Sequence, residues 1–275
     1  MLRQRLVSGV LLAIVLVSIV LLAPHSVFAA AFAVLFGIGA VEWGRLTSLD
    51  TPMAETAFLA GFVAAVVLLW WTRDGMLTQW WIAVAALFWV VVFFALRHYR
   101  QALDQSPRWQ RPLSASGLLL LPAAWAAFVA LHEIHPGWVL YIMMLCGLAD
   151  SFAFLFGKMF GKNKLAPELS PGKTIEGAAG GLFSVLVFSL LAAFYWQGFS
   201  GLQTVAFVAL SLFVGLISIE GDLFESLIKR EAGEKDSGRI LPGHGGILDR
   251  FDSHIAASPV FYLGLNGVLA WTQRS

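Results

Sequence analysis

Charged residues are scarce in this sequence. Only 13% of its 275 residues are Asp, Glu, Lys or Arg, whereas 59% are hydrophobic, and the mean hydropathy is +0.78. A soluble domain of this length needs more charge than that, so the composition excludes a soluble globular protein and predicts a polytopic membrane protein. The net charge of +1 gives no general attraction to polyanions, and we expect no nucleic-acid partner.

Cysteine is almost absent as well. The single thiol, Cys146, excludes an intramolecular disulfide. Cys and His together are too sparse for a zinc site. Internal repeats, low-complexity linkers and a second soluble domain are also missing. We therefore expect one membrane domain over 1–275, with N-terminal helices in 1–135 and catalytic helices and loops in 136–275.

Long apolar segments are abundant. A hydrocarbon core about 30 Å thick needs about 20 apolar residues per helix. Nine segments qualify: 6–23, 26–46, 54–72, 78–96, 114–132, 137–157, 177–196, 201–221 and 254–272. The first begins like a signal peptide, but its apolar run is unusually long and further spans follow, so we interpret it as a helix. The predicted fold class is all-α, an integral membrane protein with about nine transmembrane helices.

The basic residues indicate the orientation of these spans. If the N-terminus is cytoplasmic and the spans alternate, 16 Lys and Arg residues fall on the cytoplasmic side and only Arg73 and Arg274 on the other. This asymmetry is the positive-inside pattern of membrane proteins. It predicts a cytoplasmic N-terminus, and the compact chain suggests a bacterial inner membrane.

Carboxylates near the span ends point to a site at one membrane face. Ionisable groups at membrane depth are costly and usually functional. Asp150 has no local partner, and we interpret it as a site residue. Glu42 is close enough in sequence to pair with Arg45, which favours a structural role. With Glu220 and Asp222, these groups converge at the cytoplasmic side, whereas a transporter would place them near the midplane.

The segment 220–254 holds 8 of the 17 carboxylates and 5 of the 18 Lys and Arg residues. Asp222, Glu225, Ser226 and Lys229 would share one face if their helix continues past the membrane, and Gly233 would end it. Glycines surround His244, so the backbone N–H groups there can approach a ligand closely. For Asp249 and Asp252, capping of the last helix is the structural alternative.

The charges of this segment favour a bound cation. From 222 to 254 the net charge is −2, which would repel phosphate, although a glycine-rich loop with alternating charges suggests phosphate binding. Mg²⁺ resolves the conflict because it is held by one or two carboxylates together with substrate phosphates. A second polar loop, 157–176, adds Ser170, Lys173 and Thr174 as possible phosphate contacts. The residues thus predict metal-assisted phosphoryl or nucleotidyl transfer on a membrane-embedded substrate.

The segment also resembles a known family, the phosphatidate cytidylyltransferases or CDP-diacylglycerol synthases. Its signature is Ser-x-hydrophobic-Lys-Arg, four residues, Lys-Asp-x-Gly, then Pro-x-His-Gly-Gly and Asp-Arg-x-Asp. The matching residues are Ser226, Lys229, Arg230, Lys235, Asp236, Gly238, Pro242, His244, Gly245, Gly246, Asp249, Arg250 and Asp252. The stretches at Asp150 and 170–177 are similar too. The likeness covers roughly 147–254, and the first five spans contribute little to it.

The resemblance implies that CTP and phosphatidic acid give CDP-diacylglycerol and pyrophosphate, with Mg²⁺ and a possible second cation, in a homodimer. It assigns the paired-metal site to Asp222 and Asp249. The expected catalytic residues are Asp222, Lys229, Arg230, Lys235, Asp236, His244, Asp249 and Arg250, with His244 as a phosphate hydrogen-bond donor. The expected substrate-binding residues are Asp150, Ser170, Lys173, Thr174, Ser226, Gly245 and Gly246.

Three other functions are alternatives for this sequence. A CTP-dependent lipid or polyprenol kinase would attack the γ-phosphate instead of the α-phosphate. An ion-coupled transporter would use the carboxylates for solute uptake without consuming CTP. A non-catalytic membrane scaffold would need no Mg²⁺.

Overall fold

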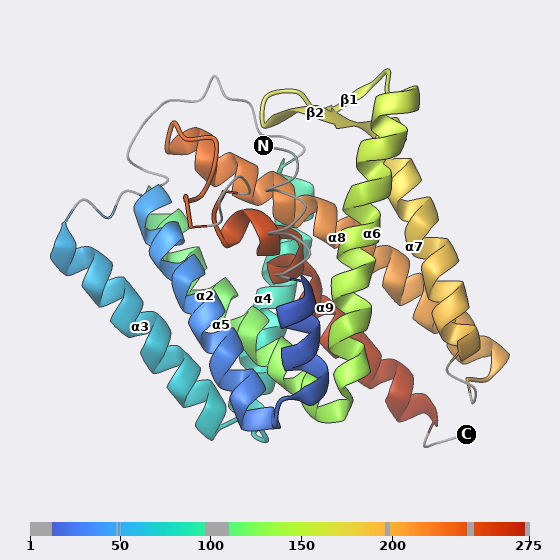
Figure 1. Ribbon diagram of the computed structural model, residues 1–275, viewed down its shortest axis with the longest axis horizontal. Helices are drawn as coiled ribbons and strands as arrows, with labels where there is room; N and C mark the ends of the chain where they lie inside the picture. Colours follow the sequence, from blue (N-terminus) through green and yellow to red (C-terminus); the bar gives the residue numbers. More distant parts are fainter. Residues whose placement is uncertain are drawn as a thin grey trace.

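The computed structural model describes residues 13–47, 49, 51–96, 110–195, 199–240 and 245–272. These residues form a helical bundle with one small hairpin (Figure 1). A short helix, Ala13–Leu22, comes first. It is followed by α2 (His25–Leu46), α3 (Pro52–Trp71), α4 (Met76–Ala95), α5 (Gln110–Ile134), α6 (Pro136–Phe160), α7 (Ile175–Tyr195), α8 (Gly201–Glu231) and α9 (Leu248–Thr272).

Among the described residues, seven helices, α2 to α8, are long and apolar enough to cross a membrane. The predicted class, an all-α polytopic membrane protein, is confirmed. The two outermost predicted spans look different from the rest. Of 6–23 the structure describes the ten-residue helix Ala13–Leu22, whereas α9 is 25 residues long but begins with the polar Asp249 and Arg250.

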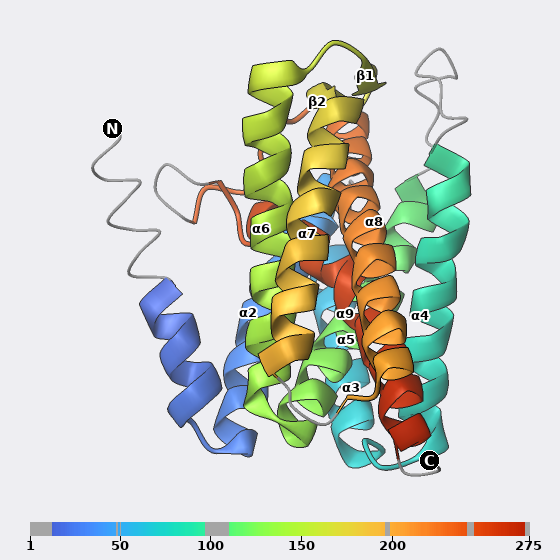
Figure 2. The same ribbon diagram turned by 90° about the vertical axis from the view of Figure 1, so that its right-hand side faces the viewer.

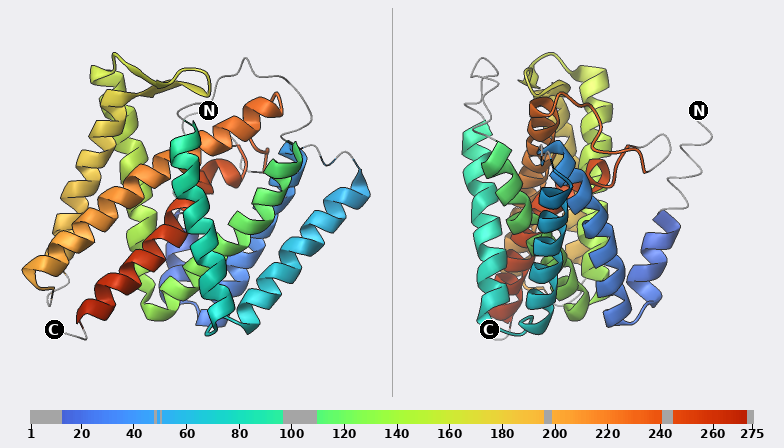
Figure 3. Two further views of the ribbon diagram at one scale, coloured as in Figure 1. Left: turned by 180° about the vertical axis from the view of Figure 1, so that it is seen from behind. Right: turned by 90° about the vertical axis from the view of Figure 1, so that its left-hand side faces the viewer.

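α8 is longer than a membrane span requires. A capping box of Ser200 and Gln203 starts it, and it runs for 31 residues to Glu231. Gly233 follows the end of the helix with φ +70°, a left-handed conformation that glycine adopts readily. As predicted, one continuous helix carries both the apolar segment and the charged residues up to Lys229, and it ends shortly before Gly233. Figures 1 and 3 show α8 beside α9 over much of their length.

Small residues bring α6 and α7 together. A Cβ atom at Gly177 would lie 2.6 Å from the Ala153 carbonyl oxygen, and one at Gly181 would lie 2.7 Å from that of Ala149. Only glycine permits such backbone proximity between helices. The glycine-rich start of α7 therefore lies directly against the backbone of α6.

The polar loop after α6 forms a two-stranded antiparallel hairpin of β1 (Lys164–Ala166) and β2 (Ser170–Thr174), with Lys164 opposite Thr174. It projects from the end of the α6–α7 pair (Figure 2). Glu176 anchors it by accepting hydrogen bonds from the backbone N–H of Lys162 (3.0 Å) and the side chain of Asn163 (2.7 Å). The sequence predicted a loop here and no strands.

The two ends of the bundle differ. The hairpin, the end of α2, the end of α8 and the start of α9 lie at one end (Figure 1). The α3–α4 connection, the α5–α6 turn and the end of α9 lie at the other (Figures 1 and 3). The segments that contain the predicted site residues therefore lie at one end of the molecule.

Candidate functional site

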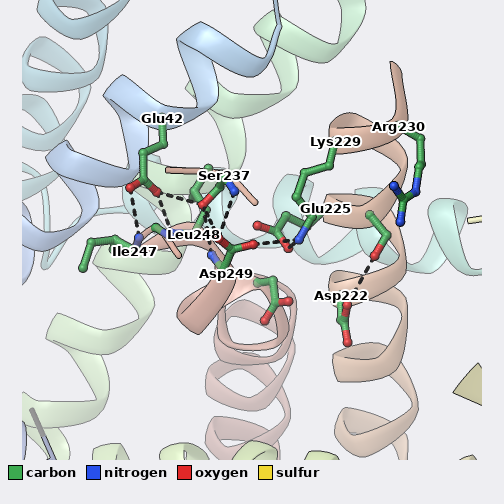
Figure 4. A network of polar contacts seen from close by, with 12 residues as sticks. Glu42, Asp222, Glu225, Lys229, Arg230, Ser237, Ile247, Leu248 and Asp249 are labelled. Atoms are coloured by element: carbon green, nitrogen blue, oxygen red, sulfur yellow. Dashed lines mark hydrogen bonds and ion pairs between the residues drawn. The ribbon is translucent and has the colours of Figure 1, made fainter. Parts of the chain in front are cut away.

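Asp249, in the first turn of α9, is the centre of a polar network (Figure 4). One carboxylate oxygen accepts from Lys229 Nζ at 2.7 Å, and the other accepts from the backbone N–H groups of Ser237 (2.9 Å) and Gly246 (2.8 Å). Burial alone would raise the pKa of Asp249, but these donors outweigh it and lower that pKa below its usual range. Asp249 is thus a fixed negative charge that joins α8, α9 and the segment between them.

The carboxylate of Glu42, in α2, is the centre of a second group of hydrogen bonds. It is buried and accepts from the backbone N–H groups of Ile247 (3.0 Å) and Leu248 (2.9 Å), which begin α9. Such N–H groups have no partner within their own helix. The Ser237 hydroxyl lies 3.1 Å from Glu42 and 3.0 Å from Asp249, so its one hydrogen can serve either carboxylate.

The structure therefore corrects the expected pairing of Glu42 with Arg45. Arg45 is exposed, and it is absent from the ion pairs of the described residues. Glu42 points inward and caps α9 instead, because a buried carboxylate is stabilised best by several N–H donors.

Lys229 is enclosed by carboxylates. Its Nζ lies 2.6 Å from Glu225 and 2.7 Å from Asp249, and its side chain is 13% exposed. Two opposite charges offset the cost of burying this ammonium group. The sequence predicted Lys229 as a catalytic residue, and the structure shows it paired with two carboxylates.

Three carboxylates gather beside this lysine: Asp222, Glu225 and Asp252 each offer one oxygen, and these oxygens lie within 4.8 Å of one another. Oε1 of Glu225 is buried and has no hydrogen-bond partner, although the side chain is only 4% exposed. A buried carboxylate oxygen without a donor is costly unless a cation or water meets it. We call these three residues the acidic cluster.

A cavity of about 450 Å³ lies next to the acidic cluster, between α6, α7, α8 and the hairpin. Its lining includes Asp150, Ser170, Lys173, Thr174 and Asp222, all predicted site residues. Lys173 Nζ is 2.6 Å from Asp222. The remaining wall is largely apolar and includes Ala153, Phe154, Leu165 and Ile219. We call it the hairpin cavity.

Two of these predicted residues also have local structural roles. The Thr174 hydroxyl accepts from the Gly177 N–H at 3.1 Å, at the start of α7. The Ser253 hydroxyl lies 3.4 Å from Asp150, which links α6 to α9. The structure thus brings together five predicted residues from three separate stretches of the sequence.

Other predicted residues lie around the network. Ser226 is 3.5 Å from Asp222, and Arg230 Nε is 3.4 Å from the Leu169 carbonyl oxygen. Lys235, Asp236 and Arg250 are exposed. His244 lies outside the described residues.

Gly245 and Gly246 form a part of the chain that passes close to the side chains of this network. Gly245 has φ +85°, and a Cβ at Gly246 would collide with Ser237 and Glu42. These glycines were expected to let N–H groups reach a ligand. In the structure the Gly246 N–H reaches Asp249.

Sequence reasoning left Glu42, Glu225, Ser237 and Asp252 out of the predicted site. Glu225 and Asp252 had a signal, because they lie three residues after Asp222 and Asp249 respectively, on the same helix faces. Ser237 had no signal beyond its place in the charged segment. Glu42 is 205 residues from Ile247, and no local pattern predicts that contact.

The fold defines this chain as a polytopic integral membrane protein with the acidic cluster and its polar network at one end. Residues 3–267 match the cytidylyltransferase family. The chain is 35% identical over 264 residues to a phosphatidate cytidylyltransferase of Pseudomonas aeruginosa, covering 95% of this chain and 96% of the relative. It is 34% identical to the one of Haemophilus influenzae, covering 95% and 97%, and 50% identical over 123 residues to the one of Staphylococcus aureus, covering 45% and 46%.

The chain therefore belongs to the cytidylyltransferase family, and it is an enzyme of the nucleotidyltransferase class. The expected family is confirmed.

Proposed function

We propose that this enzyme transfers the cytidylyl group of CTP to phosphatidic acid, giving CDP-diacylglycerol and pyrophosphate for phospholipid biosynthesis. Two relatives named phosphatidate cytidylyltransferase align with nearly the whole chain, which supports this substrate pair. The proposed site faces the cytoplasm from a bacterial inner membrane, because the described basic residues concentrate at the site end. A homodimer stays a prediction.

The observation that carries the proposal is that the hairpin cavity has both a polar, charged part and an apolar part. Lys173, Ser170 and Asp222 form its polar part, and Phe154, Leu165 and Ile219 are among its apolar residues. A lipid phosphate needs such a combination, because its headgroup is charged and its chains are not. The acidic cluster adjoins the polar part through Asp222, where CTP phosphates would meet the lipid phosphate.

The acidic cluster fits a divalent cation. Its donors are all carboxylate oxygens, as Mg²⁺ prefers, and the unpartnered Oε1 of Glu225 provides a ready ligand. We propose Asp222, Glu225 and Asp252 as the ligands. When bound, the cation would neutralise phosphate charge and make the α-phosphate more electrophilic.

Asp249, the other ligand predicted from the sequence, has less capacity for a cation. A carboxylate offers about four lone-pair positions, and Lys229, Ser237 and Gly246 already occupy at least three. We propose that Asp249 holds Lys229 and the start of α9 in place, so that the acidic cluster keeps its geometry. A second cation at Asp249 would have to share the carboxylate with these donors.

In this proposal, side chains of the protein bind and orient the two substrates. A phosphate monoester has a second pKa near 6, so the lipid phosphate is mostly dianionic at neutral pH and needs no strong base. Its oxygen attacks the α-phosphorus of CTP, and the bond to the bridging oxygen breaks as pyrophosphate leaves. Lys173 and Ser170 would bind phosphate oxygens, with Thr174 and Asp150 completing the wall.

The outer residues would bind the remainder of CTP. Arg230, Lys235 and Arg250 are exposed and can reach phosphates without breaking a buried ion pair. His244 stays a proposed phosphate hydrogen-bond donor, and Asp236, Ser226, Gly245 and Gly246 stay proposed site residues.

The purified enzyme in lipid, given phosphatidic acid, Mg²⁺ and CTP labelled at the α-phosphate, tests the reaction. We expect label in the lipid, with label at the γ-phosphate released as pyrophosphate, and no product after chelation. Label entering lipid from the γ-phosphate would instead identify a kinase. Solute uptake without consumption of CTP would identify a transporter.

The metal assignment has its own test. Glu225→Gln should reduce turnover at least about 100-fold and weaken Mn²⁺ binding measured by electron paramagnetic resonance. Glu234→Gln, at an exposed position of the same segment, is the matched control and should change neither. Unchanged Mn²⁺ affinity in Glu225→Gln would refute the assignment.

A further inference from the structure

A second cavity, of about 350 Å³, lies at the end of the bundle opposite the hairpin. It is formed where α3 and α4 connect, beside the last turns of α5 and the later part of α9 (Figures 1 and 3). Its charged lining residues are Arg73, Asp74 and Glu133. We call it the Arg73 cavity. None of the proposed catalytic or cation-binding residues lines it.

Arg73 is unusual for its position. Among the Lys and Arg residues that the structure describes, it belongs to the end where basic residues are otherwise lacking (Figure 1). It is held there firmly: its guanidinium lies over the Trp70 ring at 4.7 Å and donates to the Trp70 carbonyl oxygen at 3.1 Å. A guanidinium orientated in this way is a prepared anion site.

The guanidinium also has unused donor capacity. Its Nε is buried without a hydrogen-bond partner, and the nearest carboxylate oxygen, from Asp74, is 3.9 Å away. That distance permits attraction between the charges but no hydrogen bond. A buried N–H without an acceptor is unfavourable, and a phosphate oxygen would satisfy it.

The other charged lining residues are acidic. Asp74 and Glu133 give the cavity a net charge of −1 with Arg73, so a purely anionic ligand would meet repulsion. Gln79 and Tyr262, joined by a 2.7 Å hydrogen bond, add neutral polar groups. A ligand carrying both a phosphate and an ammonium group suits both signs of charge.

The surroundings favour a lipid over a soluble zwitterion. The cavity wall includes the apolar Leu69, Val129 and Ile134. Large apolar side chains around the same end are exposed, Trp71 at 80% and Met76 at 74%. In a membrane such residues lie at the level of lipid chains and headgroups.

We propose that the Arg73 cavity binds the headgroup of a zwitterionic phospholipid of the phosphoethanolamine type, with the phosphate at Arg73 and the ammonium at Asp74 and Glu133. This places a lipid site on the membrane face opposite the catalytic one. The inference does not depend on the proposed function, because it rests on the cavity alone.

Native mass spectrometry of the detergent-purified protein tests it, with equimolar phosphatidylethanolamine and phosphatidylglycerol of identical chains. We expect the wild type to retain phosphatidylethanolamine preferentially. Arg73→Gln should weaken that binding about tenfold, the effect of one lost charge-assisted contact. Glu133→Gln should shift the preference toward phosphatidylglycerol, since it removes a negative charge.

Two controls separate this site from others. Arg45→Gln removes an exposed arginine outside the cavity, and Lys173→Gln alters the hairpin cavity. Both should leave the phosphatidylethanolamine preference unchanged. Equal retention by the wild type and Arg73→Gln, a wild-type preference for phosphatidylglycerol, or loss of the preference in Lys173→Gln would overturn the proposal.

Discussion

At the scale of single residues, Lys229, Glu225 and Asp249 show how buried charge organises the proposed site. The lysine is within 2.7 Å of both carboxylates, and all three side chains are at most 13% exposed. Removing one partner from such a group leaves an uncompensated charge away from water. Lys229 is therefore expected to stabilise the folded protein as well as to position the groups of the proposed site.

Lys229→Met should lower the free energy of unfolding by about 3–5 kcal/mol, because Glu225 and Asp249 would remain buried without the lysine ammonium group that pairs with them. The midpoint of thermal unfolding in detergent measures this loss. Arg230→Gln, at the exposed neighbouring position, should stay within about 0.5 kcal/mol of the wild type. Similar midpoints for Lys229→Met and the wild type would contradict the burial argument.

Glu42→Gln should also destabilise the protein. The amide keeps one acceptor oxygen but places its NH₂ group against a backbone N–H of α9, so one contact becomes donor against donor. The expected cost is about 1–3 kcal/mol, seen in the unfolding midpoint and in faster proteolysis between α8 and α9. Glu55→Gln, in the exposed first turn of α3, is the control and should behave as the wild type does.

At the scale of elements, the site depends on how closely helices approach. α6 and α7 contact through glycines, and α8 meets α9 at Gly221, where a Cβ would lie 2.6 Å from the Asp252 carbonyl oxygen. These contacts fix the depth of Asp150, Asp222 and Asp252 relative to one another. Helix packing thus decides whether the carboxylates can share one cation.

Gly181→Ala tests this packing, since its Cβ would lie 2.7 Å from the Ala149 carbonyl oxygen. We expect a loss of about 1–3 kcal/mol from overpacking and reduced activity as α6 and α7 separate. Gly147→Ala, in the same region of α6 with nothing within 4 Å of the added atom, should be neutral or slightly stabilising. Equal effects of the two substitutions would show that backbone proximity is unimportant.

At the scale of the whole molecule, the two ends of the bundle have separate chemistry. The described end with the hairpin carries the acidic cluster and most basic side chains, whereas the opposite end carries the Arg73 cavity. In the proposed reaction the nucleotide and the lipid phosphate meet at the end with the hairpin. Phosphatidic acid would reach the hairpin cavity from the bilayer, and CTP from the aqueous phase.

Membrane vesicles of known orientation test this polarity. CTP is a polyanion that does not cross a bilayer, so inside-out vesicles should form CDP-lipid from external CTP, and right-side-out vesicles should do so only after permeabilisation with detergent. Activity of sealed right-side-out vesicles would place the site on the other face.

The sequence by itself determined the membrane class and the family, and it pointed to most residues of the candidate site. Hydropathy over about 20 residues follows directly from bilayer thickness, and the motif at 226–252 is local. The extension of α8 beyond its apolar segment was also predictable. Asp222, Glu225, Ser226 and Lys229 are spaced three and four residues apart, as residues on one face of a helix are.

Only the tertiary structure decided how these residues are connected. Glu42 meets α9 across 205 residues, and Asp249 accepts hydrogen bonds from Lys229 in α8 and from the N–H groups of Ser237 and Gly246 in the segment between α8 and α9. The hairpin and the Arg73 cavity likewise depend on which helices are neighbours. Such contacts arise from packing between distant segments, which local spacing does not encode.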